Sequence, residues 1–223
     1  MKKNKNEFIS KAVFLLLIVS VIFNASSCSV RQGNRQPETT VSTTSHVVRI
    51  TFPEGSAVSQ IASLLEENGV CSASDFMAEA NNPVNLEGYD FEISNPSERM
   101  FLLEGYIFPD TYEFYRNESA ASAIRRFLDN SQAKLTEEIY LRCKMLGYSL
   151  DEILTIASII QEEAGNPAVM GKVSSVLHNR LNSGSFPKLQ CDVATFYLRD
   201  YVKPYVDEDK YEQLKGLYNT YEC

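Results

Sequence analysis

The chain has 223 residues, of which 44% are hydrophobic and 22% are charged, and its formal net charge is −8. This length and composition are typical of one folded domain, or of one domain with a small additional module. A protein that binds nucleic acid through its phosphates needs clustered lysine and arginine, and here the cluster is confined to the N-terminus. Nucleic acid is therefore not expected as a partner.

The N-terminus has the features of a segment that directs the chain to a membrane. Four lysines in Met1–Lys11 precede the uninterrupted apolar run Ala12–Phe23. This order is typical of a signal peptide, and Ala25–Cys28 resembles a lipobox, in which Cys28 would carry the lipid. An uncleaved anchor is the alternative, because the uncharged stretch is nearly long enough to span a bilayer. Both interpretations tie the chain to the outer face of the cell membrane through residues 1–30.

A polar linker separates this anchor from the first expected strand. Residues 31–46 lack large apolar side chains, so they cannot bury enough surface to fold. Val47–Phe52 is rich in β-branched residues, which predicts a strand.

Two short helices are expected after this strand. Ser56 is predicted to cap the first helix, which ends at Asn68-Gly69. Ser74 is predicted to cap the second helix, over Asp75–Ala80. Residues 47–98 would then form a small strand–helix–helix module.

The remaining part of the chain, residues 99–223, is predicted to be rich in helices. After the aromatic segment Phe101–Phe114, apolar periodicity predicts helices over residues 120–135, 137–146, 150–164 and 167–181. Beyond Gly184 the pattern is mixed, and the acidic run Asp207–Asp209 is expected to be a solvated loop. The expected fold class is α+β, with the small module followed by a helix-rich domain.

The five cysteines show no spacing typical of a metal site. If Cys28 carries lipid, the other four could form disulfides or remain free thiols. Nothing in the sequence implies a metal, nucleotide or flavin cofactor.

Glu163 is the residue that the helix over 150–164 is predicted to direct toward apolar surroundings. With a turn of about 100° per residue, Ile156 and Ile160 lie on one apolar stripe, and Glu163 lies at its edge. Glu162 falls nearly opposite that stripe, toward solvent. A carboxyl group in apolar surroundings has a raised pKa, as a general acid near neutral pH requires. The alternative is that Glu163 is an exposed carboxylate at a helix end.

Five blocks in a fixed order resemble the MltG-type (YceG-like) endolytic murein transglycosylases. The blocks are Leu103–Tyr112, Ala157–Gly165, Asn179–Leu181, Leu189–Asp192 and Tyr218–Tyr221. The resemblance extends from Val47 to the end of the chain. In that family the acidic residue that matches Glu163 is catalytic.

The resemblance implies a peptidoglycan lytic transglycosylase. Such an enzyme cleaves the MurNAc–GlcNAc bond of nascent strands, leaves 1,6-anhydro-MurNAc ends, and so terminates or trims glycan elongation. Because the attacking C6 hydroxyl belongs to the substrate itself, one glutamate can serve as acid and then as base. Most glycosidases need two carboxylates. Association with the cell-wall synthesis machinery is also implied.

The other matched residues are candidates for binding the glycan. By the resemblance they are Glu104, Tyr106, Asn179, Arg180, Gln190, Asp192 and Asn219. Each has a structural alternative: Glu104 could pair locally, Tyr106 could belong to the core, and Arg180 could end a helix. The loop polar groups could simply be solvated.

Two departures from the family pattern leave alternatives open. Family members usually carry a LysM-like region where this chain has its strand–helix–helix module. They also usually continue beyond the Tyr-Asn-Thr-Tyr block, whereas this chain stops at Cys223, so the catalytic domain is expected to be C-terminally short. A membrane-attached protein that binds glycan without cutting it is one alternative. The other is a muramidase-like hydrolase with Glu104 or Asp192 as a second carboxylate.

Overall fold

The computed structural model describes residues 46–185 and 188–222. The predicted anchor over residues 1–30, with Cys28, lies outside these ranges, as does all of the linker except His46. Among the helices in the described ranges, none combines the length and the apolar character that a membrane crossing requires.

A two-stranded antiparallel sheet joins the start of the described chain to its middle. Strand β1 (Val47–Thr51) pairs with β2 (Thr111–Tyr115), with Val47 opposite Tyr115. Strand β1 confirms the predicted strand, whereas β2 was hidden in the aromatic segment. Its inward-facing Tyr112 and Phe114 are buried.

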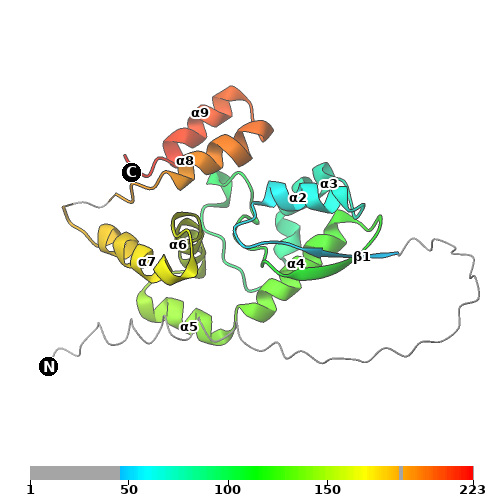
Figure 1. Ribbon diagram of the computed structural model, residues 1–223, viewed down its shortest axis with the longest axis horizontal. Helices are drawn as coiled ribbons and strands as arrows, with labels where there is room; N and C mark the ends of the chain where they lie inside the picture. The colour runs from blue at the N-terminus through cyan, green and yellow to red at the C-terminus, as the bar shows by residue number, and fades with distance from the viewer. Residues whose placement is uncertain (1–45, 186–187, 223) are drawn as a thin grey trace, which may run out of the picture. The chain divides into compact units, whose positions relative to one another are not determined.

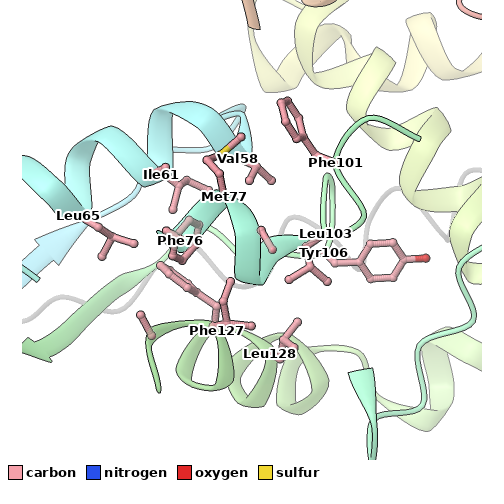
Figure 2. Close-up of a cluster of buried hydrophobic side chains, with 14 of the residues drawn as sticks. Val58, Ile61, Leu65, Phe76, Met77, Phe101, Leu103, Tyr106, Phe127 and Leu128 are labelled. Carbon is pink, nitrogen blue, oxygen red and sulfur yellow. The ribbon is translucent and has the colours of Figure 1, made fainter. Parts of the chain in front are cut away.

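Three helices enclose the main core against this sheet. They are α2 (Val58–Glu67), α3 (Ala73–Ala80) and α4 (Ala120–Lys134), and α3 contacts both of the others (Figure 1). The Phe127 ring meets Phe52 edge-on at 5.1 Å between ring centroids. It meets Phe76 edge-on at 5.9 Å (Figure 2). Such edge-to-face pairs add to the stabilisation that burial already gives. The predicted module and the segment after residue 98 therefore share one sheet and one core.

The N-terminal caps of the first two helices differ from the prediction. The Ser56 hydroxyl donates to the carbonyl of Pro53, 2.8 Å away, and Ala57 occupies the cap position of α2. Ser72, two residues before the predicted Ser74, accepts from the amide of Asp75 and caps α3. Both predictions were wrong because each helix begins at a different residue from the one predicted: Ser56 lies one residue before the cap of α2, and Ser74 lies inside the first turn of α3.

The later helices agree closely with the apolar periodicity. They are α5 (Glu137–Leu146), α6 (Leu150–Glu163) and α7 (Pro167–Leu181). Gly147 ends α5 with φ +80°, a conformation that favours glycine. Ser149 and Glu152 form a capping box at the start of α6. The helix that carries Glu163 therefore has a well-defined beginning.

The chain beyond Gly184 contains regular structure that the sequence did not predict. Helix α8 (Val193–Tyr197) continues through the π-helical turn η4 (Leu198–Val202) and the 3-10 turn η5 (Lys203–Tyr205), and α9 (Glu208–Leu217) follows. Short 3-10 turns also occur at η2 (Pro83–Leu86) and η3 (Pro96–Glu98).

The expected solvated loop over Asp207–Asp209 is instead the start of α9. The side chain of Asp207 accepts from the amide of Lys210 at 2.8 Å, and acidic residues at a helix N-terminus complement its dipole. The described chain is rich in helices with one small sheet, which confirms the α+β class. The LysM-like character of the module and the domain boundaries stay predictions.

Candidate active site

Glu163 is the last residue of α6, and its side chain is exposed. The prediction that the helix buries it at the edge of an apolar face was wrong. The apolar stripe is only partly covered near this end of the helix, because Ile159 and Ile160 are half-buried and Ala157 is exposed. The buried residues Leu150 and Ile156 lie farther toward the start of α6, and Ala164, directly after the end of the helix, is also buried.

Charged residues from three segments lie close enough to Cys191, which is buried, to shift the pKa of its thiol. Burial raises the pKa of the Cys191 thiol, and the negative charge of Glu163 raises it further. Arg180 lowers this pKa and Asp192 raises it. Arg180 also donates a hydrogen bond to the carbonyl of Leu189. The structure thus brings Glu163, Arg180 and Asp192, three of the predicted site residues, around one thiol.

The C-terminal segment completes this group. The amide of Gln190 donates to the carbonyl of Thr220 at 2.9 Å, and the Tyr221 hydroxyl donates to Asp192 at 2.7 Å. Asn219 accepts from the amide of Tyr221 at 3.0 Å. Gln190 itself has φ +52°. The fourth and fifth sequence blocks therefore lie side by side, and we call Glu163, Arg180, Gln190, Asp192 and Tyr221 the Glu163 group.

Glu104 belongs to a separate, more buried arrangement. Its carboxylate accepts from the amide of Val58 at 3.1 Å and from the hydroxyl of Tyr197 at 2.8 Å. Burial raises the pKa of Glu104 to about 7, although both hydrogen bonds and the nearby Arg99 lower it. Glu104 supplies the acceptor that Ala57 lacks at the start of α2, and so it joins α2 to α8.

Tyr106 is part of the core. Its side chain is 2% exposed, and its hydroxyl donates to Asp151 at 2.7 Å. Asp151 is also buried and accepts from the guanidinium of Arg99 and the amide of Ser94. Because the ring presents no open face, the structure supports the interpretation of Tyr106 as a core residue rather than a platform for a sugar.

A close approach at Gly55 places the start of α2 against the end of α6. A Cβ atom at Gly55 would lie 2.8 Å from Oε1 of Glu162 and 3.7 Å from Cγ of Gln161. The loop before α2 thus lies beside the residues that precede Glu163. Within the described ranges, no hydrogen bond or ion pair joins Glu104 to Glu163.

Asn179 is exposed near the end of α7, one residue before Arg180. Sequence reasoning missed Tyr197, Asp151 and Arg99, whose roles depend on contacts between distant segments. Tyr221 was part of the fifth block but was not named as a site residue, and the tyrosine-rich C-terminus was the signal available for Tyr197. Among the described residues, no set of three His, Cys, Asp or Glu side chains is arranged to hold a metal ion.

Comparison with known proteins relates this chain to one family and to enzymes of one kind. The YceG-like family matches residues 28–223. The chain is 28% identical over 193 residues to the endolytic murein transglycosylase of Bacillus subtilis (strain 168), covering 80% of this chain and 51% of that protein. It is 29% identical over 164 residues to the endolytic murein transglycosylase of Streptococcus pneumoniae serotype 2, covering 66% and 29%. The chain therefore spans about half the length, or less, of these relatives.

The fold is similar to that of a YceG-like protein from Listeria monocytogenes. The TM-score is 0.65 at 24% identity, over 78% of this chain and 59% of that one. The family match covers most of the chain and includes every residue of the Glu163 group. The chain belongs to the YceG-like family.

Proposed function

We propose that this protein is a lytic endotransglycosylase that cleaves the MurNAc–GlcNAc bond of nascent peptidoglycan strands and leaves 1,6-anhydro-MurNAc ends. The observation that carries this proposal is the family match, together with two relatives named as endolytic murein transglycosylases. Cleavage of this kind would terminate or trim a growing glycan.

Glu163 is the proposed acid and base. It would protonate the glycosidic oxygen as the bond to C1 breaks, and then accept the proton of the C6 hydroxyl as that oxygen bonds to C1. Its exposure at the end of α6 leaves the carboxylate accessible to a polymer that could not enter an enclosed cavity. Because acid and base roles follow one another, a single carboxylate suffices.

The neighbouring polar groups are the proposed contacts for the glycan. Arg180, Gln190 and Asp192 lie in the same group as Glu163, and their guanidinium, amide and carboxylate suit sugar hydroxyl and acetamido groups. Asn179 and Asn219 lie next to this group along the chain. Glu104 is proposed to position α2 and α8, since its oxygens already accept hydrogen bonds from both.

The enzyme is proposed to work at the outer face of the cell membrane, held by residues 1–30 as an anchor or by lipid on Cys28. The basic and apolar pattern of the N-terminus supports this placement. Access to nascent strands would follow from the same placement, close to the cell-wall synthesis machinery.

A hydrolase that uses a second carboxylate is the alternative with a specific observation in its favour. Asp192 and Glu163 both raise the pKa of the Cys191 thiol, so both carboxylates lie near this residue. A hydrolase would leave reducing MurNAc ends, because water rather than the C6 hydroxyl attacks C1.

Product analysis separates these functions. The full chain is incubated with uncrosslinked glycan strands, and the new ends are identified by mass spectrometry. Anhydro-MurNAc ends are the expected result. Reducing ends would show that the protein is a hydrolase instead. Intact strands that still bind the protein would show that it binds glycan without cleaving it.

A further inference from the structure

Two aromatic side chains near Asp192 face solvent. Phe196 is 48% exposed and Tyr221 is 42% exposed. A single exposed apolar side chain is common on protein surfaces and needs no explanation. Two exposed rings that both lie beside one residue of the Glu163 group are a candidate for a binding surface.

Helix α8 determines the position of Phe196. The amide of Phe196 donates to the carbonyl of Asp192 at 3.0 Å, so the two residues are one helical turn apart. Residues four positions apart lie on the same face of a helix, and both of these are exposed. With a rise of about 1.5 Å per residue, Phe196 lies about 6 Å along the helix axis from Asp192. The exposed face that begins at Asp192 therefore continues to an aromatic ring.

A cation restricts the ring of Phe196. The guanidinium of Arg199 lies over this ring, 5.0 Å from its centroid. Arg199 is held in turn by two hydrogen bonds to Asp200, both 2.6 Å long. Because a guanidinium over an aromatic ring is attractive, Arg199 limits the orientations of Phe196 while much of the ring stays in contact with solvent.

Tyr221 brings the second ring close to Glu163. Its hydroxyl donates to Asp192 at 2.7 Å, which fixes the side chain although the residue is exposed. This hydrogen bond raises the pKa of the Tyr221 hydroxyl, and the negative charge of Glu163 raises it further. Glu163, Tyr221 and Asp192 therefore lie near one another, and Phe196 lies one turn of α8 beyond them.

The combination of rings and polar groups fits a glycan better than a protein partner. A pyranose has an apolar face of C–H groups, which packs on an aromatic ring, and hydroxyl groups at its edge. Asp192 lies between the two rings and can accept from such hydroxyls. Two aromatic side chains offer at most about 500 Å² of contact, whereas a stable protein interface takes about 800 Å² from each partner.

We propose that the exposed rings of Tyr221 and Phe196 form a platform for consecutive sugar rings of a glycan strand. Tyr221 would contact the sugar next to the bond that is cleaved, and Phe196 would contact a sugar farther along the strand. Because its ligand is the strand that Glu163 is proposed to cleave, this platform rests on the proposed function.

Equilibrium binding of uncrosslinked glycan strands to the full chain tests the platform. All the proteins carry Glu163→Gln, so that binding is measured with little cleavage. Phe196→Ala should raise the dissociation constant roughly tenfold. Tyr115→Ala is the matched control, since Tyr115 is 59% exposed on β2 and outside the Glu163 group. An unchanged constant in Phe196→Ala, or equal weakening by both variants, would overturn the proposal.

Conservative variants separate ring stacking from other roles. Phe196→Tyr keeps the flat ring and should retain binding, whereas Phe196→Leu is apolar without a flat face and should weaken it nearly as much as alanine. Likewise, Tyr221→Ala should weaken binding more than Tyr221→Phe, which keeps the ring but lacks the hydrogen bond to Asp192. Equal binding by the tyrosine and leucine variants of Phe196 would contradict a platform.

Two further measurements distinguish this platform from the fold and from the proposed function. The urea midpoint of Phe196→Ala should equal that of the parent protein, and a clearly lower midpoint would assign the ring to the fold instead. If a protein that retains Glu163 forms anhydro-MurNAc ends while Phe196→Ala binds strands normally, only the platform is wrong. If strands bind without being cleaved, the proposed function fails, and weaker binding by Phe196→Ala would still support the platform. Strands that do not bind at all would overturn both.

Discussion

The carboxylate of Glu104 accepts a hydrogen bond from the hydroxyl of Tyr197 at 2.8 Å, across 93 residues of sequence. The same carboxylate accepts from the amide of Val58, the first residue of α2. The Glu104 side chain thus connects helix α2, which packs on the main core, to helix α8, which begins directly after Asp192. Its protonation state should influence how firmly these elements are held.

The stability of the protein should fall as pH rises through the pKa of Glu104. That pKa is about 7 in the folded chain against an ordinary value of 4.5, so between these values the folded state holds a proton that the unfolded state has released. The contribution is fully present below pH 4.5 and is lost as pH rises through about 7, by up to roughly 3 kcal/mol. Glu104→Gln cannot titrate and should lack this loss.

Urea unfolding of both proteins at about pH 5 and pH 8, on either side of the raised pKa, checks this prediction. The difference between wild type and variant should change with pH, because other titrating groups are common to both. As a companion, Tyr197→Phe removes a hydrogen bond that lowers the pKa of Glu104, so in this variant the loss of stability should continue to a higher pH than in the wild type. Parallel pH profiles for wild type and Glu104→Gln would show that this carboxyl group does not have a raised pKa.

Removing Asp151 should destabilise the fold strongly. Asp151 is 4% exposed and accepts from Tyr106 and Arg99. Asp151→Ala therefore leaves a guanidinium without its counter-ion and leaves the Tyr106 hydroxyl with only the carbonyl of Glu92, 3.4 Å away. The expected loss is about 3–5 kcal/mol in the free energy of unfolding. Glu152, the next residue, is already engaged with Ser149 in the capping box of α6 and offers no replacement acceptor.

Tyr106→Phe is the milder comparison for this cluster. It removes one hydrogen bond to a charged group and leaves the ion pair with Arg99, so a loss of roughly 1.5–3 kcal/mol is expected. Equal losses for Asp151→Ala and Tyr106→Phe in denaturant titrations would show that the ion pair adds nothing.

Gly55→Ala should destabilise the contact between the start of α2 and the end of α6. Gly55 has φ +80°, which costs other residues about 1–2 kcal/mol, and its added Cβ would meet Oε1 of Glu162 at 2.8 Å. Thermal unfolding should show a loss of at least about 1 kcal/mol. A second change, Glu162→Ala, should relieve the collision but not the backbone strain, so full recovery in the double variant would contradict this explanation.

Gln190→Gly should separate stability from function. Gln190 has φ +52°, and glycine adopts this conformation without strain, so the folded protein should gain up to about 1 kcal/mol. If the glutamine side chain contacts the glycan as proposed, the rate of strand cleavage should nevertheless fall. Asn95→Gly is the matched control, because Asn95 has φ +47° and lies outside the Glu163 group. An unchanged cleavage rate in Gln190→Gly would remove this residue from the proposed substrate contacts.

Periodicity predicted the helices well but not their surroundings. The start of α6 follows from Ser149 and the start of α7 from Pro167, which are local signals, together with the apolar spacing of both helices. The exposure of Glu163 could not be predicted, because it depends on how much of α6 its neighbours cover. The pairing of β1 with β2 was also missed, since it joins segments about 60 residues apart along the chain.

The sequence predicted which blocks contribute residues to the site, but not which of these residues contact one another. Sequence reasoning placed Gln190 and Asp192 in one block and Asn219 in another, and the structure joins them through Thr220 and Tyr221. Glu104 was grouped with them by its position in the first block, yet its contacts lie with Val58 and Tyr197. Hydrogen bonds between distant segments decide such assignments, and no local pattern encodes them.

The catalytic role of Glu163 is tested most directly by the rate at which Glu163→Gln cleaves uncrosslinked glycan strands. The substitution keeps the shape of an exposed side chain but removes its ability to donate and accept the proton, so anhydro-MurNAc ends should appear about 10²–10⁴-fold more slowly. Glu162→Gln changes the neighbouring exposed carboxylate in the same way and should retain most of the activity. Wild-type rates in Glu163→Gln, or equal losses in both variants, would contradict the assignment of Glu163 as the catalytic acid and base.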